Sequence, residues 1–188
     1  RADRLKIRPF IPTVALCSQI IPGVTQRGMC FMPIQYVAGD ATQPQGDGPK
    51  VIVHCCNDQG AWGKGFVLAL SQRWPEPERQ YRAWSAGGRA QPFALGEVQF
   101  VPVTSDLWVA NLIGQHGIRR QGGQPPIRYE ALRAGFQRVA SFAREHGASA
   151  HMPRLGAGLA GGDWTIISQL LEEELIDRGI PVTVYDLP

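Results

Sequence analysis

Short apolar runs with the spacing of β-strands recur along the chain. The run Val51–Cys56 is apolar except at His54, which predicts a strand buried on both faces. Two further runs, 96–104 and 107–114, are separated by the turn residues 104–106 and predict an antiparallel hairpin. Three more strands are expected at Phe31–Val37, 149–154 and Pro181–Leu187.

Between these strands, apolar residues recur at helical spacing. The longest pattern runs over Arg128–His146, and another covers 163–178, where Gly179 supplies a stop signal. Shorter helices are expected near 63–73 and at Pro77–Trp84, because proline suits a first turn whose N–H would be unpaired anyway. The apolar positions that define the two long patterns are Leu132, Phe136, Val139 and Ala143, and Trp164, Ile167, Leu171 and Leu175.

Alternation of strands and helices, with one antiparallel pair, predicts a mixed central sheet between two layers of helices. The expected fold class is therefore α/β, with three layers in the order α/β/α. A chain of 188 residues suits one domain with a substantial core. We assign this domain to residues 31–188 and interpret residues 1–30, which show weak periodicity, as an amino-terminal extension.

Composition narrows the class of protein without naming a function. Hydrophobic residues make up 44% of the chain and charged residues 19%, as in ordinary soluble domains. The net charge of +3 is mildly basic, but the arginines are scattered, so no specific nucleic-acid site is predicted. No apolar stretch approaches the ~20 residues of a membrane span. We expect a cytoplasmic monomer that makes no membrane contact.

The cysteines and histidines suggest neither a disulfide framework nor a metal site. Cys55 and Cys56 are adjacent on a predicted strand, so their side chains point to opposite faces. No C-x-x-C occurs, and the histidines lack metal-ligand spacing. Reduced thiols are therefore the favoured interpretation, and neither a metal nor a cofactor is expected.

Two glycine-rich loops carry the strongest indication of function. One lies within Met152–Trp164 and follows a predicted strand, and the other, Asn57–Gly65, follows Val51–Cys56. Glycines let backbone N–H groups turn toward a ligand, and a helix start favours anions such as phosphate. The spacing fits neither a P-loop nor the dinucleotide fingerprint. We expect the loops to converge at the carboxyl ends of neighbouring strands, whereas the alternative is two ordinary βα connections.

Four segments, taken in order, resemble the macrodomain family of ADP-ribose-binding modules. They are Gly39-Asp40 after the first strand, His54-Cys55 leading to Trp62-Gly63-Lys64-Gly65, Pro153–Leu159, and Val182–Tyr185 at the end. The resemblance covers about residues 32–187. It is strongest toward the macrodomain branch that contains the terminal ADP-ribose protein glycohydrolase and a chromatin remodeller.

This resemblance implies a binding site for ADP-ribose. Asp40 would accept a hydrogen bond from the adenine amino group, although its spacing alone favours a turn or capping role. The first loop would pass near the distal ribose and the second would wrap the diphosphate. Arg154 would reach a phosphate or a bound carboxyl, with a surface salt bridge as the alternative. The implied ligand-binding residues are Asp40, Ala41, Asn57, Gly63, Gly65, Phe66, Arg154, Gly156, Ala157, Gly158, Leu159, Tyr185 and Leu187.

The chain departs from the related glycohydrolase at the positions of its catalytic lysine and aspartate, which are Gln115 and Ala160 here. Neither side chain can form a Schiff base or act as a carboxylate base. Asn57 and Gln115 are the candidate catalytic residues, each as a group that orients a water molecule. For His116 a structural role is favoured, and for Asp163 that of a helix cap.

Two functions remain open. The chain is either a hydrolase that removes ester-linked ADP-ribose from acidic side chains, or a reader that binds ADP-ribose without turnover. The missing catalytic pair favours the reader, and a stand-alone domain favours the enzyme, because a reader usually needs an attached effector. We favour the hydrolase, with ADP-ribose and ADP-ribosylated macromolecules as its ligands.

Overall fold

A single mixed sheet organises the part of the chain that the computed structural model describes, residues 33–87 and 90–187. Its six strands lie in the order β1-β6-β5-β2-β4-β3. Neighbouring strands are parallel, except that β3 and β4 pair antiparallel as predicted. The proposed extension, residues 1–30, lies outside the described residues. The strands are β1 (Gln35–Ala38), β2 (Lys50–Asn57), β3 (Val98–Pro102), β4 (Leu107–Gln115), β5 (Ser149–Pro153) and β6 (Val182–Asp186).

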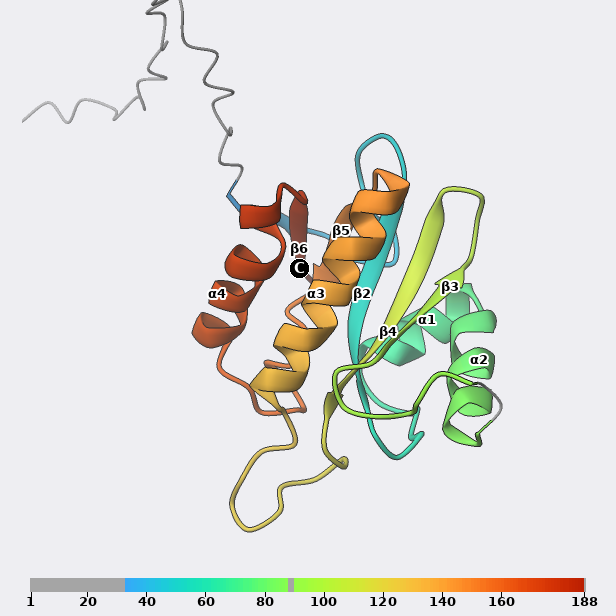
Figure 1. Cartoon of the computed structure of the whole chain (residues 1–188), viewed down its shortest axis with the longest axis vertical. Helices are drawn as coiled ribbons and strands as arrows, with labels where there is room; N and C mark the ends of the chain where they lie inside the picture. Colours follow the sequence, from blue (N-terminus) through green and yellow to red (C-terminus); the bar gives the residue numbers. More distant parts are fainter. Residues whose placement is uncertain (1–32, 88–89, 188) are drawn as a thin grey trace, which may run out of the picture.

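Helices cover both faces of this sheet, so the predicted three-layer α/β/α class is confirmed (Figure 1). One face packs against α3 (Tyr129–His146) and α4 (Trp164–Glu174). The other packs against α1 (Phe66–Arg73) and α2 (Glu76–Ser85). A short 3-10 helix, η1 (Ile176–Arg178), follows α4.

The central strand β2 shows why the sheet is buried on both sides. Val51 and Val53 belong to the core under α3 and α4, whereas Ile52 and Cys56 belong to the core under α1 and α2. Cys55 packs against the α3–α4 core, so the two cysteines face opposite sides as predicted.

Several predicted elements differ in their bounds, two of them by four residues at one end. The first strand begins at Gln35, after Pro33, whose missing N–H cannot join a ladder. The predicted helix over 163–178 ends at Glu174, because the backbone of Leu175 (φ −118°) leaves helical geometry. The chain then tightens into η1, which ends at the left-handed Gly179.

Helix α3 approaches β4 closely through glycines. A Cβ atom on Gly135 would lie 2.5 Å from Cγ of Leu112, and one on Gly114 would lie 2.6 Å from Leu132. Real Cβ atoms do not approach neighbours this closely, and both leucines are fully buried. The close approach of α3 therefore depends on these two positions.

We predict that Gly135→Ala destabilises the protein by about 1–3 kcal/mol, because overpacking against Leu112 outweighs the gain in helix propensity of about 1 kcal/mol. Urea denaturation followed by circular dichroism measures this free energy of unfolding. Gln137→Ala, at an exposed position of the same helix, should change it by less than about 0.5 kcal/mol. A Gly135→Ala variant more stable than the wild type would contradict the packing argument.

Candidate functional site

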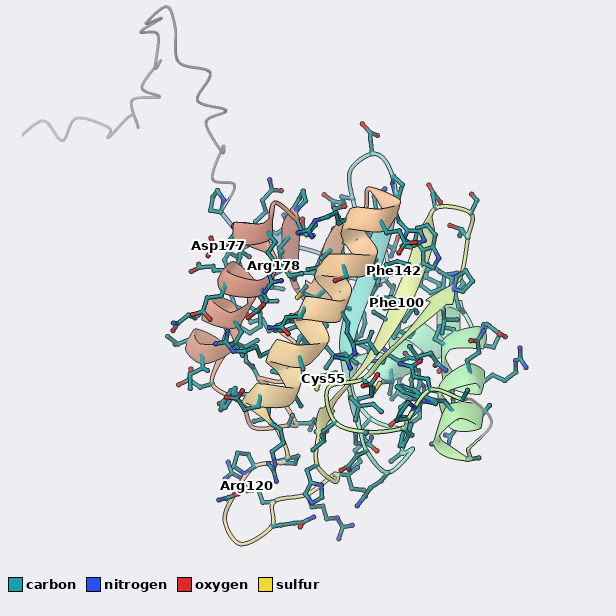
Figure 2. The ribbon with its side chains drawn as sticks, in the orientation of Figure 1. Cys55, Phe100, Arg120, Phe142, Asp177 and Arg178 are labelled. Atoms are coloured by element: carbon teal, nitrogen blue, oxygen red, sulfur yellow. The ribbon has the colours of Figure 1, made fainter. Side chains whose placement is uncertain are left out.

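A cavity of about 250 Å³ opens at the carboxyl ends of the parallel strands. Figure 2 labels Cys55 at the base of this region, near the lower end of β2. The cavity includes seven residues that the sequence predicted for the site: Gly65, Phe66, Gln115, Arg154, Gly156, Gly158 and Leu159. The two glycine loops therefore converge on one cavity, as expected from the parallel strand order.

The loops touch across the cavity. A Cβ atom on Gly65 would lie 3.4 Å from Cδ1 of Leu159, whose side chain is 74% exposed. Gly65 adopts φ +77° at the start of α1, which L side chains rarely adopt, so glycine is required there. The start of α1 thus faces the Gly156–Ala160 loop.

Both loops present backbone N–H groups that have no hydrogen-bond acceptor among the described residues. They include those of Phe66 and Val67, which open α1, and those of Gly158, Leu159 and Ala160. First-turn N–H groups carry the positive end of the helix dipole and bind anions. The cavity is therefore suited to a phosphate or diphosphate group.

Asn57 holds the first loop in shape. Its Oδ1 accepts hydrogen bonds from the N–H groups of Gln59 and Ala61, each at 3.0 Å, and its Nδ2 donates to the carbonyl of Ala61 at 2.6 Å. Its side chain is buried and does not line the cavity. The structure thus gives Asn57 a loop-ordering role.

Gln115, by contrast, lies in the cavity wall at the end of β4. Its side chain hydrogen-bonds the thiol of Cys55, and burial raises the pKa of that thiol to about 12. The thiol is therefore neutral and a poor nucleophile.

His54 forms part of the cavity floor and is held neutral. Its Nε2 donates to Oδ1 of Asn111 at 2.6 Å. Burial lowers the pKa of His54 to about 4, although the bond to Asn111 opposes the shift. The other ring nitrogen, Nδ1, lies 3.7 Å from Sγ of the buried Cys56, so both ring nitrogens already have partners within the protein.

Asp40 lies outside this cavity, in a turn that follows β1. Its carboxylate accepts from the N–H of Thr42 at 2.8 Å and from the Thr42 hydroxyl at 2.7 Å. Burial alone would raise the pKa of Asp40, but these bonds and one from Gln43 bring it below its ordinary value. The carboxylate is therefore charged and keeps lone pairs that can accept a further donor.

Tyr185 is buried, and its hydroxyl serves the fold. It accepts from the N–H of Gln45 at 2.8 Å and lies 3.0 Å from Nδ1 of His151, whose Nε2 lies 2.8 Å from Ser149 Oγ. Because burial lowers the pKa of His151 to about 4, the ring is neutral. Its Nδ1 therefore accepts a hydrogen bond from the Tyr185 hydroxyl. Tyr185 thus anchors the segment after Asp40.

Arg154 lines the cavity, and its guanidinium forms a salt bridge with Asp186. Its guanidinium donates twice to Asp186, at 2.6 and 2.8 Å, and lies 5.2 Å from the ring centres of both Tyr36 and Trp164. The salt bridge that the sequence left as an alternative is therefore present. The Asp163 cap is confirmed as well, since its Oδ1 accepts from the Thr165 N–H at 2.8 Å.

The remaining predicted ligand residues do not line the cavity. Ala41 is buried beside Asp40, Gly63 is exposed in the first loop, Ala157 packs on the core, and Leu187 is 78% exposed after β6. The cavity also contains seven residues that the sequence did not assign to it, although all of them stand inside or beside the four macrodomain-like segments. These additional residues are His54, Cys55, Lys64, Val67, Pro153, Leu155 and Ala160.

The described residues contain no group of three or more His, Cys, Asp or Glu side chains that could hold a metal ion. No helix among them is both long enough and apolar enough to span a membrane.

A mixed α/β/α sheet with a glycine-lined cavity at its carboxyl edge is typical of α/β domains that bind ligands outside the carboxyl ends of their strands. No protein-family model matches the chain. A solved structure of the macrodomain protein from Streptomyces coelicolor is 54% identical, with a TM-score of 0.73, and the match covers 82% of this chain and 99% of that one. This chain therefore belongs to the macrodomain family.

Further proteins are similar to this chain over most of its length. A protein of unknown function from Bacteroides thetaiotaomicron is 57% identical, with a TM-score of 0.81, and the match covers 83% of this chain and 99% of that one. Mouse chromodomain-helicase-DNA-binding protein 1-like is 34% identical over an alignment of 165 positions, which covers 82% of this chain and 18% of that protein. The chain thus spans less than a fifth of the first curated relatives, 18% and 15% of their lengths.

The names or structure titles of two more distant relatives include ADP-ribose. The ADP-ribose 1''-phosphate phosphatase of Aspergillus clavatus is 24% identical, over 83% of this chain and 97% of that protein. DarTG of Thermosipho africanus, solved in complex with ADP-ribose, is 18% identical, with a TM-score of 0.60 over 74% of this chain and 38% of that one. The latter likeness shows the fold alone.

The two buried neutral histidines predict a pH-dependent stability. The pKa of each is about 4 in the folded state, against about 6.5 unfolded, so the unfolded chain binds more protons between these values. The free energy of unfolding should therefore fall as the pH drops from 6.5 to 4, by roughly 3 kcal/mol per histidine.

Urea denaturation at pH 7, 6.5, 6 and 5.5 measures this slope above the range in which carboxylates titrate. His54→Gln keeps an amide donor toward Asn111 without a titrating group, so its slope should be about half that of the wild type. An unchanged slope would show that His54 is not held neutral.

Proposed function

We propose that this macrodomain binds ADP-ribose at the carboxyl edge of its sheet and hydrolyses ADP-ribose esters of acidic side chains. The observation that carries the proposal is the pair of facing loops, whose unpaired N–H groups converge on one cavity. Two phosphates would lie between the start of α1 and the Gly156–Ala160 loop, where these groups and the helix dipole favour negative charge.

Two polar side chains, one at each end of the proposed ligand, give it a direction. Asp40, beyond one side of the cavity, would accept a hydrogen bond from the adenine amino group. Gln115 lines the cavity wall and would lie beside the distal ribose and the ester. The A. clavatus phosphatase and T. africanus DarTG support ADP-ribose as the ligand class, because both are named with ADP-ribose or its phosphate.

The chemistry of the cavity limits the reaction to good leaving groups. No Asp or Glu is among the described residues that line it. The ring of His54 is hydrogen-bonded to Asn111, and the Cys55 thiol is neutral. Cleavage would therefore rest on a water molecule oriented by Gln115 and by the bound phosphates. A carboxylate, whose conjugate acid has a pKa of about 4, leaves without an added proton, whereas serine and arginine linkages need a general acid.

A reader without turnover is the second candidate. The same absence of a carboxylate from the described cavity lining favours it. Measured release of ADP-ribose decides between the two functions, and binding is common to both.

Binding is tested at Gly158. This residue does not adopt a positive φ, and a Cβ atom there would meet nothing within 4 Å, so a side chain is tolerated by the fold. Gly158→Glu should weaken ADP-ribose binding about 100-fold, because a carboxylate would face the diphosphate. Isothermal titration calorimetry measures the affinity.

Two matched variants separate charge from bulk at this position. Gly158→Ala should bind nearly as the wild type does, and Gly158→Gln should lose less affinity than Gly158→Glu. Equal binding by a folded Gly158→Glu variant would remove the loop from the site.

Turnover is tested with a peptide that carries ADP-ribose on one glutamate. We expect slow release of ADP-ribose, and none from serine- or arginine-linked peptides. Gln115→Ala should slow release about tenfold, equivalent to ~1.4 kcal/mol of barrier, because no single side chain supplies the base. Tight binding without release over hours would establish the reader instead.

A further inference from the structure

Three exposed basic side chains lie on loops at the carboxyl edge of the sheet: Lys64, Arg119 and Arg120. Among the described residues, none of the three has a carboxylate within ion-pair distance. Six arginines elsewhere do have such partners: Arg79, Arg82, Arg133, Arg138, Arg154 and Arg178. Paired cations are neutralised locally, so the positive potential at this edge comes from the unpaired ones.

Two of these cations lie on the loop 117–126, which is internally ordered. The backbones of Gln121 and Gln124 exchange two hydrogen bonds, at 3.1 and 3.0 Å, around Gly122 and Gly123. Both glycines have positive φ, as a tight two-residue turn requires. Nη1 of Arg120 donates to the carbonyl of Gly123 at 2.9 Å, which fixes one end of its guanidinium.

Further bonds tie both ends of this loop to the body of the protein. At its start, Asp58 accepts from the N–H of Gly117 and lies 2.7 Å from Nδ1 of His116. At its end, Arg128 donates to three successive carbonyl groups. The loop therefore presents Arg119 and Arg120 at defined positions beyond the edge of the sheet, where Figure 2 labels Arg120.

The loop lies next to residues that line the cavity, or that adjoin its lining in sequence. The N–H of Ile127 donates to the carbonyl of Ala160, which lines the cavity. Nη2 of Arg120 lies 3.5 Å from the position of a Cβ atom on Gly161, the next residue. Gln115, at the proposed ester end, stands two residues before the loop begins.

We propose that Lys64, Arg119 and Arg120 bind carboxylates of the acceptor chain, so that the preferred substrate is an acidic polypeptide segment. This inference rests on the proposed function, because it takes the ester to lie beside Gln115. Segment 117–126 contains no Asp or Glu. The nearby carboxylates already have partners. Asp58 accepts from the N–H of Gly117 and contacts His116, and Asp163 caps its helix. Arginine guanidinium groups match carboxylates in geometry as well as charge, and Arg120 keeps donors beyond the one bonded to Gly123.

A polypeptide fits this surface better than a nucleic acid does. Proteins that bind single strands combine positive charge with aromatic side chains on which bases stack. Segment 117–126 has no aromatic residue, and its one large apolar side chain, Ile118, is 53% exposed. An exposed isoleucine suits the apolar part of a peptide.

The test compares two peptides that each carry ADP-ribose on a single central glutamate, one flanked by Asp and Glu and the other by Ser and Gly. The wild type should show about tenfold higher kcat/KM for the acidic peptide at low salt, and the preference should fall as salt is raised. Arg119→Ala/Arg120→Ala should remove the preference and leave the affinity for free ADP-ribose unchanged.

A matched variant controls for total charge. Arg79→Ala/Arg82→Ala, on α2, lowers the net charge from +3 to +1 as the loop variant does, since each removes two arginines. It should keep the preference for the acidic peptide. Arg119→Glu/Arg120→Glu should reverse the preference toward a lysine-flanked peptide.

The outcomes separate this inference from the proposed function. If free ADP-ribose binds but neither peptide is cleaved, equilibrium binding of the two peptides replaces kcat/KM and tests the same preference. Equal values for the two peptides, or equal loss in both double-alanine variants, would overturn the inference alone. Competition by oligo(dT) that exceeds competition by oligoglutamate would assign the surface to nucleic acid instead.

Discussion

The parallel pairing of β2 with both β4 and β5 is the constraint on which the rest of the structure depends. Parallel strands end at a common edge, so the loops that follow β2, β4 and β5 leave the sheet side by side. Because apolar residues cover both faces of β2, helices enclose the sheet and only its edge remains for a ligand. The site is thus a consequence of strand order more than of any one side chain.

Most polar side chains near this edge serve the fold. Asn57 shapes the first loop, Tyr185 anchors the segment after Asp40, and Arg154 is paired with Asp186. A side chain already bonded in this way has less conformational freedom to lose, and it keeps the surrounding backbone rigid. Backbone N–H groups remain as the main means of holding an anion, which explains why glycine content was the clearest indication of the site.

The sequence therefore predicted the fold and the convergence of the loops better than it predicted the role of each residue. Apolar periodicity gave the sheet, the hairpin and α3, because burial imposes that periodicity locally. It could not place the end of α4, where the chain tightens over Leu175 and Gly179 in a way that depends on tertiary packing. Nor could it foresee that Arg154 meets Asp186, since that contact depends on the parallel pairing of β5 with β6.

Electrostatics connects the proposed reaction to the proposed acceptor surface. In ester cleavage, negative charge develops on the departing carboxylate, which needs no proton but gains from nearby positive charge. Lys64 lines the cavity, and Arg120 lies near Gly161, the residue that follows the cavity-lining Ala160. The cations that would bind an acidic segment would therefore also stabilise the leaving group within it. A carboxylate base in the same cavity would oppose this effect, and no Asp or Glu is among the described residues that line it, which suits a site for carboxylate leaving groups.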